Sequence, residues 1–179
     1  MPESASNTPI DLIAADYGIR QLHARFVEAT WRMDSAAFAE CFARDGQWKI
    51  AGLDLRGRDA IGATIGRMLS AAYRKVMLNI GQPVLDVIDG GVVGRVPVTE
   101  FAQMLDGSSA MSIGIYYDWY VEQGGRWRFA KRHWNFQYRG PVDLTGTFLD
   151  RPDYGPPPGM PGPDEPTYVR PQQDISRER

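Results

Sequence analysis

The sequence predicts an α+β domain with three N-terminal helices and a long antiparallel sheet. Apolar residues recur at spacings of three and four in the first part of the chain, which is typical of amphipathic helices. After Tyr73, apolar and polar residues alternate instead, which is typical of half-buried strands. Glycine-containing turns separate these alternating stretches and favour hairpin connections between successive strands.

Two helices are expected before the first strand. The first spans residues 10–31, where the apolar side chains form one stripe along the helix. Asp34 is expected to cap a second, shorter helix that runs to about Ala43, because its carboxylate can accept a backbone N–H of the first turn. The Asp45-Gly46 turn should end that helix.

A third helix and five strands complete the expected fold. Gly57 and Asp59 open the helix, which covers about residues 59–73. A short strand that carries Trp48 precedes it, and the four later strands form an antiparallel meander. The predicted strands span residues 47–55, 82–87, 92–104, 109–122 and 125–138.

One domain is expected at residues 10–140, between a flexible N-terminus at 1–9 and a C-terminal arm at 141–179. A chain of 179 residues has the length of a single domain. Eight of the thirteen prolines follow residue 151, and proline cannot donate a hydrogen bond to a neighbouring strand. The arm either packs on a neighbouring subunit or is a mobile end, and the sequence leaves both possibilities open.

Composition excludes several classes of function. The single cysteine, Cys41, can form neither an internal disulfide nor a thiolate metal site alone, and the two histidines lack the spacing of a metal-binding pair. A net charge of −2, with basic residues spread along the chain, argues against nucleic-acid binding. There is no apolar run long enough to span a membrane and no signal-peptide pattern. We therefore expect a cytoplasmic protein without metal that binds a small molecule or a protein partner.

Three local strings stand out along this order of elements: ARFVEATWRMDSAAFAECFARDGQW, LRGRDAI and GGRWRFAKRHWNF. Together with the order of helices and strands, they resemble the SnoaL-like branch of the nuclear transport factor 2-like superfamily over about residues 10–140. The resemblance implies a curved sheet that wraps a cone-shaped pocket, closed by the first helices. It also implies a homo-oligomer, with a trimer favoured, and an activity that needs no cofactor.

In dehydratase-like and dehydrochlorinase-like members of that family, a strand histidine is the base and an aspartate at the end of the first helix fixes its tautomer. This sequence departs from that pattern. The aspartate position aligns with Trp31 and the histidine position with Leu78. The ketosteroid-isomerase arrangement is missing as well, since its tyrosine falls on Phe26 and its carboxylate near Ile50. The resemblance therefore implies the pocket without the dyad.

Four residues are candidates for the chemistry. The family's inward arginine falls on Arg132, which either binds developing negative charge or pairs with a carboxylate such as Asp118 or Glu100. Alternation places Tyr116 and Asp118 on one face, so Asp118 is either a general base or half of a structural ion pair. Tyr116 either donates a proton or fills the core. His23 either reaches the pocket mouth or is a surface or hydrogen-bonded residue.

Inward-facing apolar residues, most of them aromatic, are expected to line the pocket and to hold the substrate. Such a cone suits a flat aromatic or polycyclic ligand better than a sugar or a nucleotide. In the alternative interpretation, the same side chains simply fill the cone and leave no pocket. The candidate substrate-binding residues are Trp31, Trp48, Phe26, Leu78, Trp134 and Phe136.

These observations predict a cofactor-independent lyase that dehydrates, eliminates from or deformylates a hydrophobic aromatic or polycyclic compound. A phenolic substrate, such as one derived from lignin, would supply part of its own activation and reduce the need for the missing histidine. Two alternatives stay open at this point. One is an isomerase or cyclase of a steroid-like or polyketide-like substrate, and the other is a non-catalytic ligand-binding or accessory subunit.

Overall fold

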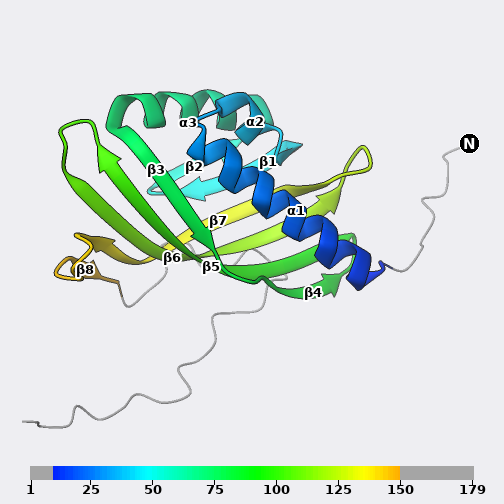
Figure 1. The fold of residues 1–179 in the computed structure, drawn as a ribbon. Coiled ribbons are helices and arrows are strands. Elements are labelled where there is room, and N and C mark those ends of the chain that lie inside the picture. Colours follow the sequence, from blue (N-terminus) through cyan, green and yellow to red (C-terminus); the bar gives the residue numbers. More distant parts are fainter. Residues whose placement is uncertain (1–9, 150–179) are drawn as a thin grey trace, which may run out of the picture.

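Three helices lie over the concave side of a strongly curved sheet, and the core fills the space between them (Figure 1). The computed structural model describes residues 10–149, so the predictions for residues 1–9 and 150–179 lie outside the described part of the chain. No helix within residues 10–149 is long and apolar enough to cross a membrane. The architecture is the α+β class that the sequence predicts.

All three predicted helices are present, and the second and third follow Asp34 and Gly57 as the sequence predicts. The helices are α1 (Leu12–Trp31), α2 (Ser35–Ala39) and α3 (Arg58–Ala72). The carboxylate of Asp11 accepts two backbone N–H groups in the first turn of α1, and that of Asp34 accepts the N–H of Ala37 at 2.9 Å. The predicted end of the second helix at Ala43 is wrong, because Phe42 already begins a strand.

The strands confirm the meander and correct its beginning. They are β1 (Phe42–Ile50), β2 (Leu53–Arg56), β3 (Tyr73–Ile80), β4 (Val84–Ile88), β5 (Gly91–Met104), β6 (Ser109–Glu122), β7 (Trp127–Gly140) and β8 (Thr147–Phe148). The strand predicted at 47–55 is a hairpin, because Ala51 and Gly52 turn the chain with positive φ angles of 47° and 83°. The sequence pattern missed β3, because only Val76 and Leu78 of this strand are fully buried.

Strand pairing explains the curvature that makes a pocket possible. The path through the sheet is β2-β1-β7-β6-β5-β3, and β4 also pairs with β5. The two halves of the long strand β5 therefore have different partners, β4 on its first half and β3 on its second. Strand β1 pairs with β7 in parallel, so the sheet is mixed rather than purely antiparallel. That pairing joins the N-terminal helices to the last long strand.

Two irregularities in the pairing of β6 with β7 decide which side chains face the helices. The register shifts between Ile113 and Gly114, and again between Trp119 and Tyr120, so β7 carries an extra residue at Gln137 and at Ala130. A bulge of this kind bends its strand and reverses the alternation beyond it. As a result, Arg139 faces the same side as Phe136, although strict alternation would point it outward.

Gly114 allows the close approach of β6 to β7 under the aromatic wall, and Gly114→Ala should destabilise the protein. An added Cβ would lie 2.5 Å from the carbonyl oxygen of Asn135 and 2.6 Å from the Trp134 ring. We expect a loss of about 1–3 kcal/mol in the free energy of unfolding, measured by urea denaturation. Gly66→Ala is the control, because its Cβ would meet only the small Ser35 side chain at 3.1 Å. Equal stability of the two variants would contradict this account.

Candidate active site

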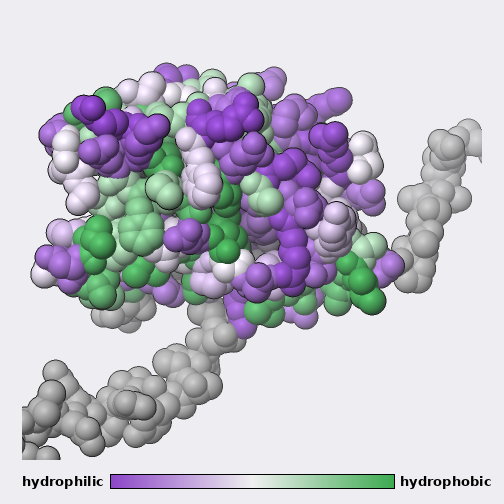
Figure 2. Space-filling view, in the orientation of Figure 1, coloured by the Kyte–Doolittle hydropathy of each residue, from purple (hydrophilic) through white to green (hydrophobic). Residues whose placement is uncertain are grey.

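A pocket of about 130 Å³ lies inside the cone, between α1 and α3 on one side and the concave face of the sheet on the other. Figure 2, drawn in the orientation of Figure 1, shows hydrophobic side chains gathered beside β3 on the visible face of the molecule. The aromatic wall includes a Tyr116 and Trp134 pair with ring centroids 4.6 Å apart. Six of the ten residues that the sequence singles out line this pocket, namely Phe26, Trp48, Leu78, Tyr116, Trp134 and Phe136.

A row of residues crosses four strands along one edge of this pocket. Leu78 on β3 is paired with Glu100 on β5, Glu100 with Ser112 on β6, and Ser112 with Arg139 on β7. All four residues line the pocket. The row places one carboxylate, one hydroxyl and one guanidinium along the edge of an otherwise apolar cavity, which is the usual composition of a small-molecule site.

Glu100 is the carboxylate of this row. Within residues 10–149, its side chain makes no hydrogen bond or salt bridge. Burial raises the pKa of Glu100 above its ordinary value, and the charge of Arg139 partly opposes that rise. Burial also raises the pKa of the neighbouring Tyr73 hydroxyl, and the charge of Glu100 adds to the effect. A carboxyl group that is easily protonated and lies beside an open cavity is suited to proton transfer.

Tyr116 and Trp48 bring two further polar groups to the pocket wall. The Tyr116 hydroxyl has no hydrogen-bond partner in the described part of the chain, and the Trp48 Nε1–H is buried without one. Burial raises the pKa of Tyr116, while the positive charge of Arg132 opposes the rise. The Arg132 guanidinium carbon lies 3.7 Å from the centroid of the Tyr116 ring. Both groups can therefore donate a hydrogen bond to a bound molecule.

Beneath the pocket, Arg132 and Asp118 form a fully buried ion pair across β7 and β6. The guanidinium donates from Nε to Oδ1 of Asp118 at 2.8 Å and from Nη2 to Oδ2 at 3.0 Å. The Tyr120 hydroxyl donates to the same Oδ2 at 3.0 Å. Three donors thus converge on one carboxylate, which is how a buried charge is compensated.

His23 completes this network from α1. Its Nδ1 lies 3.3 Å from Nη2 of Arg132, and its Nε2 lies 2.9 Å from the Tyr120 hydroxyl. A guanidinium can only donate, so Nδ1 must accept and Nε2 must carry the hydrogen that it donates to Tyr120. Burial and the charge of Arg132 lower the pKa of His23 well below its ordinary value. The imidazole is therefore neutral, as this hydrogen-bond cycle requires.

The structure thus separates the four candidate catalytic residues. Tyr116 lines the pocket, whereas Arg132, Asp118 and His23 form a network that supports the pocket floor. Aromatic rings enclose the guanidinium, whose central carbon lies 3.8 Å from the ring centroid of Phe129 as well as close to Tyr116. Arg132 does not line the pocket, and its contacts with the pocket wall are with the ring faces of Phe26 and Tyr116.

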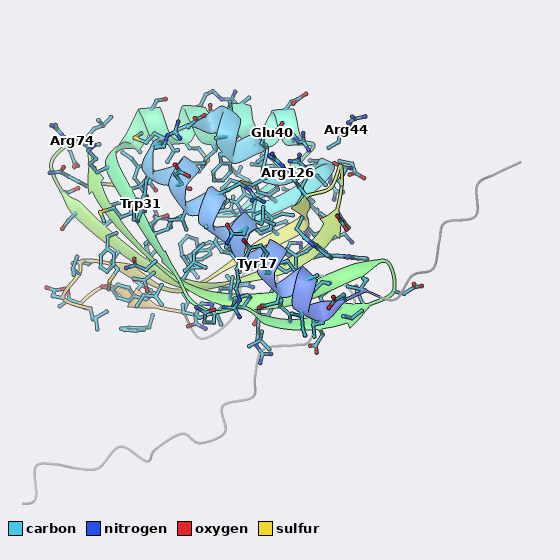
Figure 3. The ribbon with its side chains drawn as sticks, turned by 45° about the vertical axis from the view of Figure 1, so that its right-hand side comes forward. Tyr17, Trp31, Glu40, Arg44, Arg74 and Arg126 are labelled. Atoms are coloured by element: carbon cyan, nitrogen blue, oxygen red, sulfur yellow. The ribbon has the colours of Figure 1, made fainter. Side chains whose placement is uncertain are left out.

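Trp31 does not share the cone with the other aromatic residues, which corrects the prediction of one common cavity. Its side chain is 48% exposed and lines a separate, open groove of about 540 Å³ between α1 and β3. Figure 3 shows Trp31 and Tyr17 along α1. The reason is helical phase, because Phe26 and Thr30 of α1 face the cone and the next position turns away. Leu78 lies between the two spaces and lines both.

Sequence reasoning missed Glu100, Ser112 and Arg139 as site residues. Glu100 left a readable signal, since it interrupts the inward apolar series of β5 that includes Val96 and Val98. The sequence pattern gives no sign that Arg139 faces the pocket, because the bulge at Gln137 reverses the alternation just before it.

The structure supports neither a nucleophilic cysteine nor a metal centre among the described residues. Burial raises the pKa of the Cys41 thiol to about 11, so this cysteine is a poor nucleophile. Within residues 10–149, no three histidine, cysteine, aspartate or glutamate side chains converge closely enough to hold a metal ion.

Asp118→Asn should destabilise the protein strongly, because it leaves the buried charge of Arg132 uncompensated. We expect a loss of about 3–5 kcal/mol in the free energy of unfolding, measured by urea denaturation. The control is the double variant Asp118→Leu with Arg132→Met, which removes both charges and should recover most of that loss. If Asp118→Asn lowered the free energy of unfolding by less than the double variant does, the ion pair would not support the pocket floor.

His23 should make the protein less stable in mild acid. Its pKa is lowered on folding, so below about pH 6.5 the unfolded chain takes up a proton that the folded protein excludes. The free energy of unfolding should then fall by up to about 1.4 kcal/mol for each pH unit from this residue alone. Urea denaturation at several pH values between 7 and 5 gives the free energy of unfolding as a function of pH. This free energy should fall less steeply with decreasing pH in His23→Gln than in the wild type, and an equal fall in both proteins would exclude a neutral buried imidazole.

Solved structures share this fold at low sequence identity. A candidate scytalone dehydratase from Novosphingobium aromaticivorans superposes with a TM-score of 0.69 at 16% identity, over 78% of this chain and 96% of that one. A type 3 hexachlorocyclohexane dehydrochlorinase from Novosphingobium barchaimii gives 0.67 at 17% identity, over 79% and 97%. A nuclear transport factor 2-like superfamily protein from Salmonella enterica gives 0.66 at 15% identity, over 74% and 97%.

The sequence itself decides the family. No curated protein matches the chain. The family model of the SnoaL-like domain matches residues 12–133, which is more than half of the 179 residues. The match runs from the first residue of α1 into β7, and so includes both the helices and most of the sheet that form the cone. The chain therefore belongs to the SnoaL-like domain family.

Proposed function

We propose that this protein is a cofactor-independent lyase that acts on a hydrophobic aromatic small molecule in the cone pocket. The reaction would be a dehydration, another elimination or a deformylation, and a lignin-derived phenolic is one substrate of suitable chemistry. One observation carries the proposal. A partly buried carboxylate without a hydrogen-bond or salt-bridge partner in the described chain, Glu100, faces an aromatic pocket and is paired across the sheet with Leu78.

Glu100 is the proton acceptor in this proposal. The strand position of the family histidine is Leu78, so the base has moved one strand across the sheet while still facing the same cavity. An ordinary glutamate is too weak a base for efficient proton abstraction at neutral pH. The raised pKa of Glu100 brings the carboxylate closer to the range in which a general base is effective.

Tyr116 is the hydrogen-bond donor. In a dehydration or other elimination, Glu100 removes a proton from carbon, the electron pair of the C–H bond becomes the new double bond, and the leaving group departs with its own bonding pair. In a deformylation, Glu100 removes the O–H proton of a hydroxymethyl group, the O–H pair becomes the C=O bond of formaldehyde, the C–C bonding pair becomes the new double bond, and the leaving group on the next carbon departs with its own pair. Tyr116 donates to the oxygen on which negative charge develops. The guanidinium of Arg132, stacked on the Tyr116 ring, opposes the burial that would make this hydroxyl a poorer donor.

The fold neighbours support this class of reaction by analogy. Two of them carry the names of a dehydratase and a dehydrochlorinase, and both names describe an elimination. An isomerase would use the same first step, since it also begins with removal of a proton from carbon. The lyase is the better proposal, because both of these names describe loss of a group rather than its migration.

A ligand-binding protein is the second candidate function. The observation that favours it is the loss of both dyad positions, since Trp31 is an exposed groove residue and Leu78 is apolar. Such a protein would keep the pocket and the polar edge without turning over the bound molecule. Turnover therefore separates the two candidates, whereas binding alone does not.

The test begins with a thermal-shift screen of the purified protein against phenolics, diaryl compounds, polyketide-like aromatics and steroids. Compounds that raise the melting temperature are then incubated with the protein without any cofactor, and products are identified by mass spectrometry. We expect a product that has lost water, a hydrogen halide or formaldehyde. Compounds that stabilise the protein but give no product would overturn the lyase and favour the binding protein.

Glu100→Gln should keep binding and lose turnover. A general base contributes about 10²-fold to 10⁴-fold to the rate of a reaction. We therefore expect kcat to fall at least about 100-fold in Glu100→Gln, while the thermal shift caused by the bound compound stays unchanged. The wild-type kcat/KM should rise with pH, with a midpoint above the pKa of an ordinary glutamate. Glu122→Gln, at the exposed opposite end of β6, is the matched control and should keep full activity. Retained turnover in Glu100→Gln would show that another group is the base.

A further inference from the structure

We infer that the cone pocket takes an aromatic compound with a single ring and an anionic substituent, and that Arg139 binds the anionic group. The inference rests on the proposed function, whose substrate class it narrows. It combines three observations about the same cavity: its volume, a guanidinium at its edge that makes no salt bridge within residues 10–149, and the two-strand separation of Arg139 from Glu100.

The volume sets the number of rings. The pocket measures about 130 Å³. An apolar protein cavity of about 150 Å³ binds one molecule of benzene. The same space cannot hold the fused rings of a steroid or of a polyketide-like aromatic without opening the cone. The surrounding aromatic wall, which includes Trp134 and Phe136 in edge contact at 5.3 Å, presents ring faces and edges to a flat ligand.

Arg139 sets the charge. It is the one basic side chain among the described residues that line this pocket. Its guanidinium is exposed and makes no salt bridge within residues 10–149, although its carbon lies 5.6 Å from the centroid of the Phe136 ring. An arginine at the edge of an aromatic pocket can bind a carboxylate through two parallel hydrogen bonds. The adjacent Ser112 hydroxyl can add a third donor.

The order of Glu100, Ser112 and Arg139 across the strands determines how a bound substrate is oriented. Glu100 and Arg139 are two strands apart, with Ser112 between them, which corresponds to about 10 Å between their backbones. A bound anion would be repelled by Glu100 and attracted by Arg139, so it lies at the β7 end of the row. The ring then occupies the cone between the two ends. This places the part of the substrate away from the anionic group beside Glu100.

Three probes and two variants test the inference by isothermal titration calorimetry. The probes are 3-phenylpropanoate, its neutral methyl ester, and 3-(2-naphthyl)propanoate, which keeps the acid but has two fused rings. The variants are Arg139→Gln and Arg126→Gln. Arg126 precedes the other end of β7, so its substitution removes the same charge far from the pocket (Figure 3).

We expect the wild type to bind 3-phenylpropanoate at least tenfold more tightly than either its ester or the naphthyl acid. Arg139→Gln should abolish the preference for the acid over the ester while leaving ester binding unchanged, which also shows that this variant is folded. Arg126→Gln should keep the full preference. Measurement near pH 7 keeps the propanoates ionised.

Two results would overturn the inference and leave the proposed lyase standing. One is equal binding of acid and ester, or a preference that survives in Arg139→Gln. The other is binding of the naphthyl acid as tight as that of the single-ring acid. Failure of all three probes to bind the wild type would overturn the inference together with the proposed aromatic pocket, which distinguishes that case from the first two.

Discussion

The buried ion pair between Arg132 and Asp118 joins the sheet to the helix that covers it. The two residues face each other across β7 and β6, Tyr120 donates to the carboxylate, and His23 from α1 accepts from Nη2 of the guanidinium, while Nη1 has no hydrogen-bond partner in the described part of the chain. Burying two charges is costly unless hydrogen bonds compensate them, so these contacts favour the arrangement in which α1 lies over β6 and β7. Phe26 and Tyr116, which stack on the guanidinium, also line the pocket, and the position of the aromatic wall therefore depends on the ion pair.

This dependence explains why a strongly charged group lies so close to an apolar cavity without opening into it. The cation is enclosed by ring faces, which attract it, and by one carboxylate, which neutralises it. Its charge opposes the rise that burial causes in the pKa of Tyr116, whose ring lies against the guanidinium and lines the pocket. The polar groups that do face the cavity, at Glu100, Ser112 and Arg139, are by contrast unpaired within the described chain and lie at its edge. The ion pair that supports the fold and the charged groups that can meet a ligand are thus different residues at different positions along the same sheet.

Local sequence patterns predicted most of the fold, and they failed where a long-range contact or an irregular strand decides the outcome. The Asp34 cap, the first helix and the three long strands follow from spacing and turn chemistry, and the Asp118 and Arg132 pair follows from alternation on adjacent strands. The parallel pairing of β1 with β7 carries no local signal, because it joins segments about 80 residues apart. Alternation also placed Trp134 and Phe136 correctly but could not reach Arg139, since a bulge at Gln137 intervenes.

A leucine at position 78, where the resemblance implies a histidine, need not remove proton-transfer chemistry from a cone of this kind. A pocket lined by neighbouring strands offers several positions that face the same volume, and cross-strand pairs lie only about 5 Å apart. Leu78 and Glu100 form such a pair, so a base at either position can address a ligand in the same cavity. The base of the proposed lyase is anionic at rest, whereas a histidine base is neutral, and an anionic base in an apolar pocket needs a nearby cation to remain ionised. Arg139, on the same row and opposing the rise in the pKa of Glu100, supplies that cation. In the proposed lyase, the Glu100 carboxylate and the Arg139 guanidinium at the pocket edge therefore act together in place of a histidine and an aspartate.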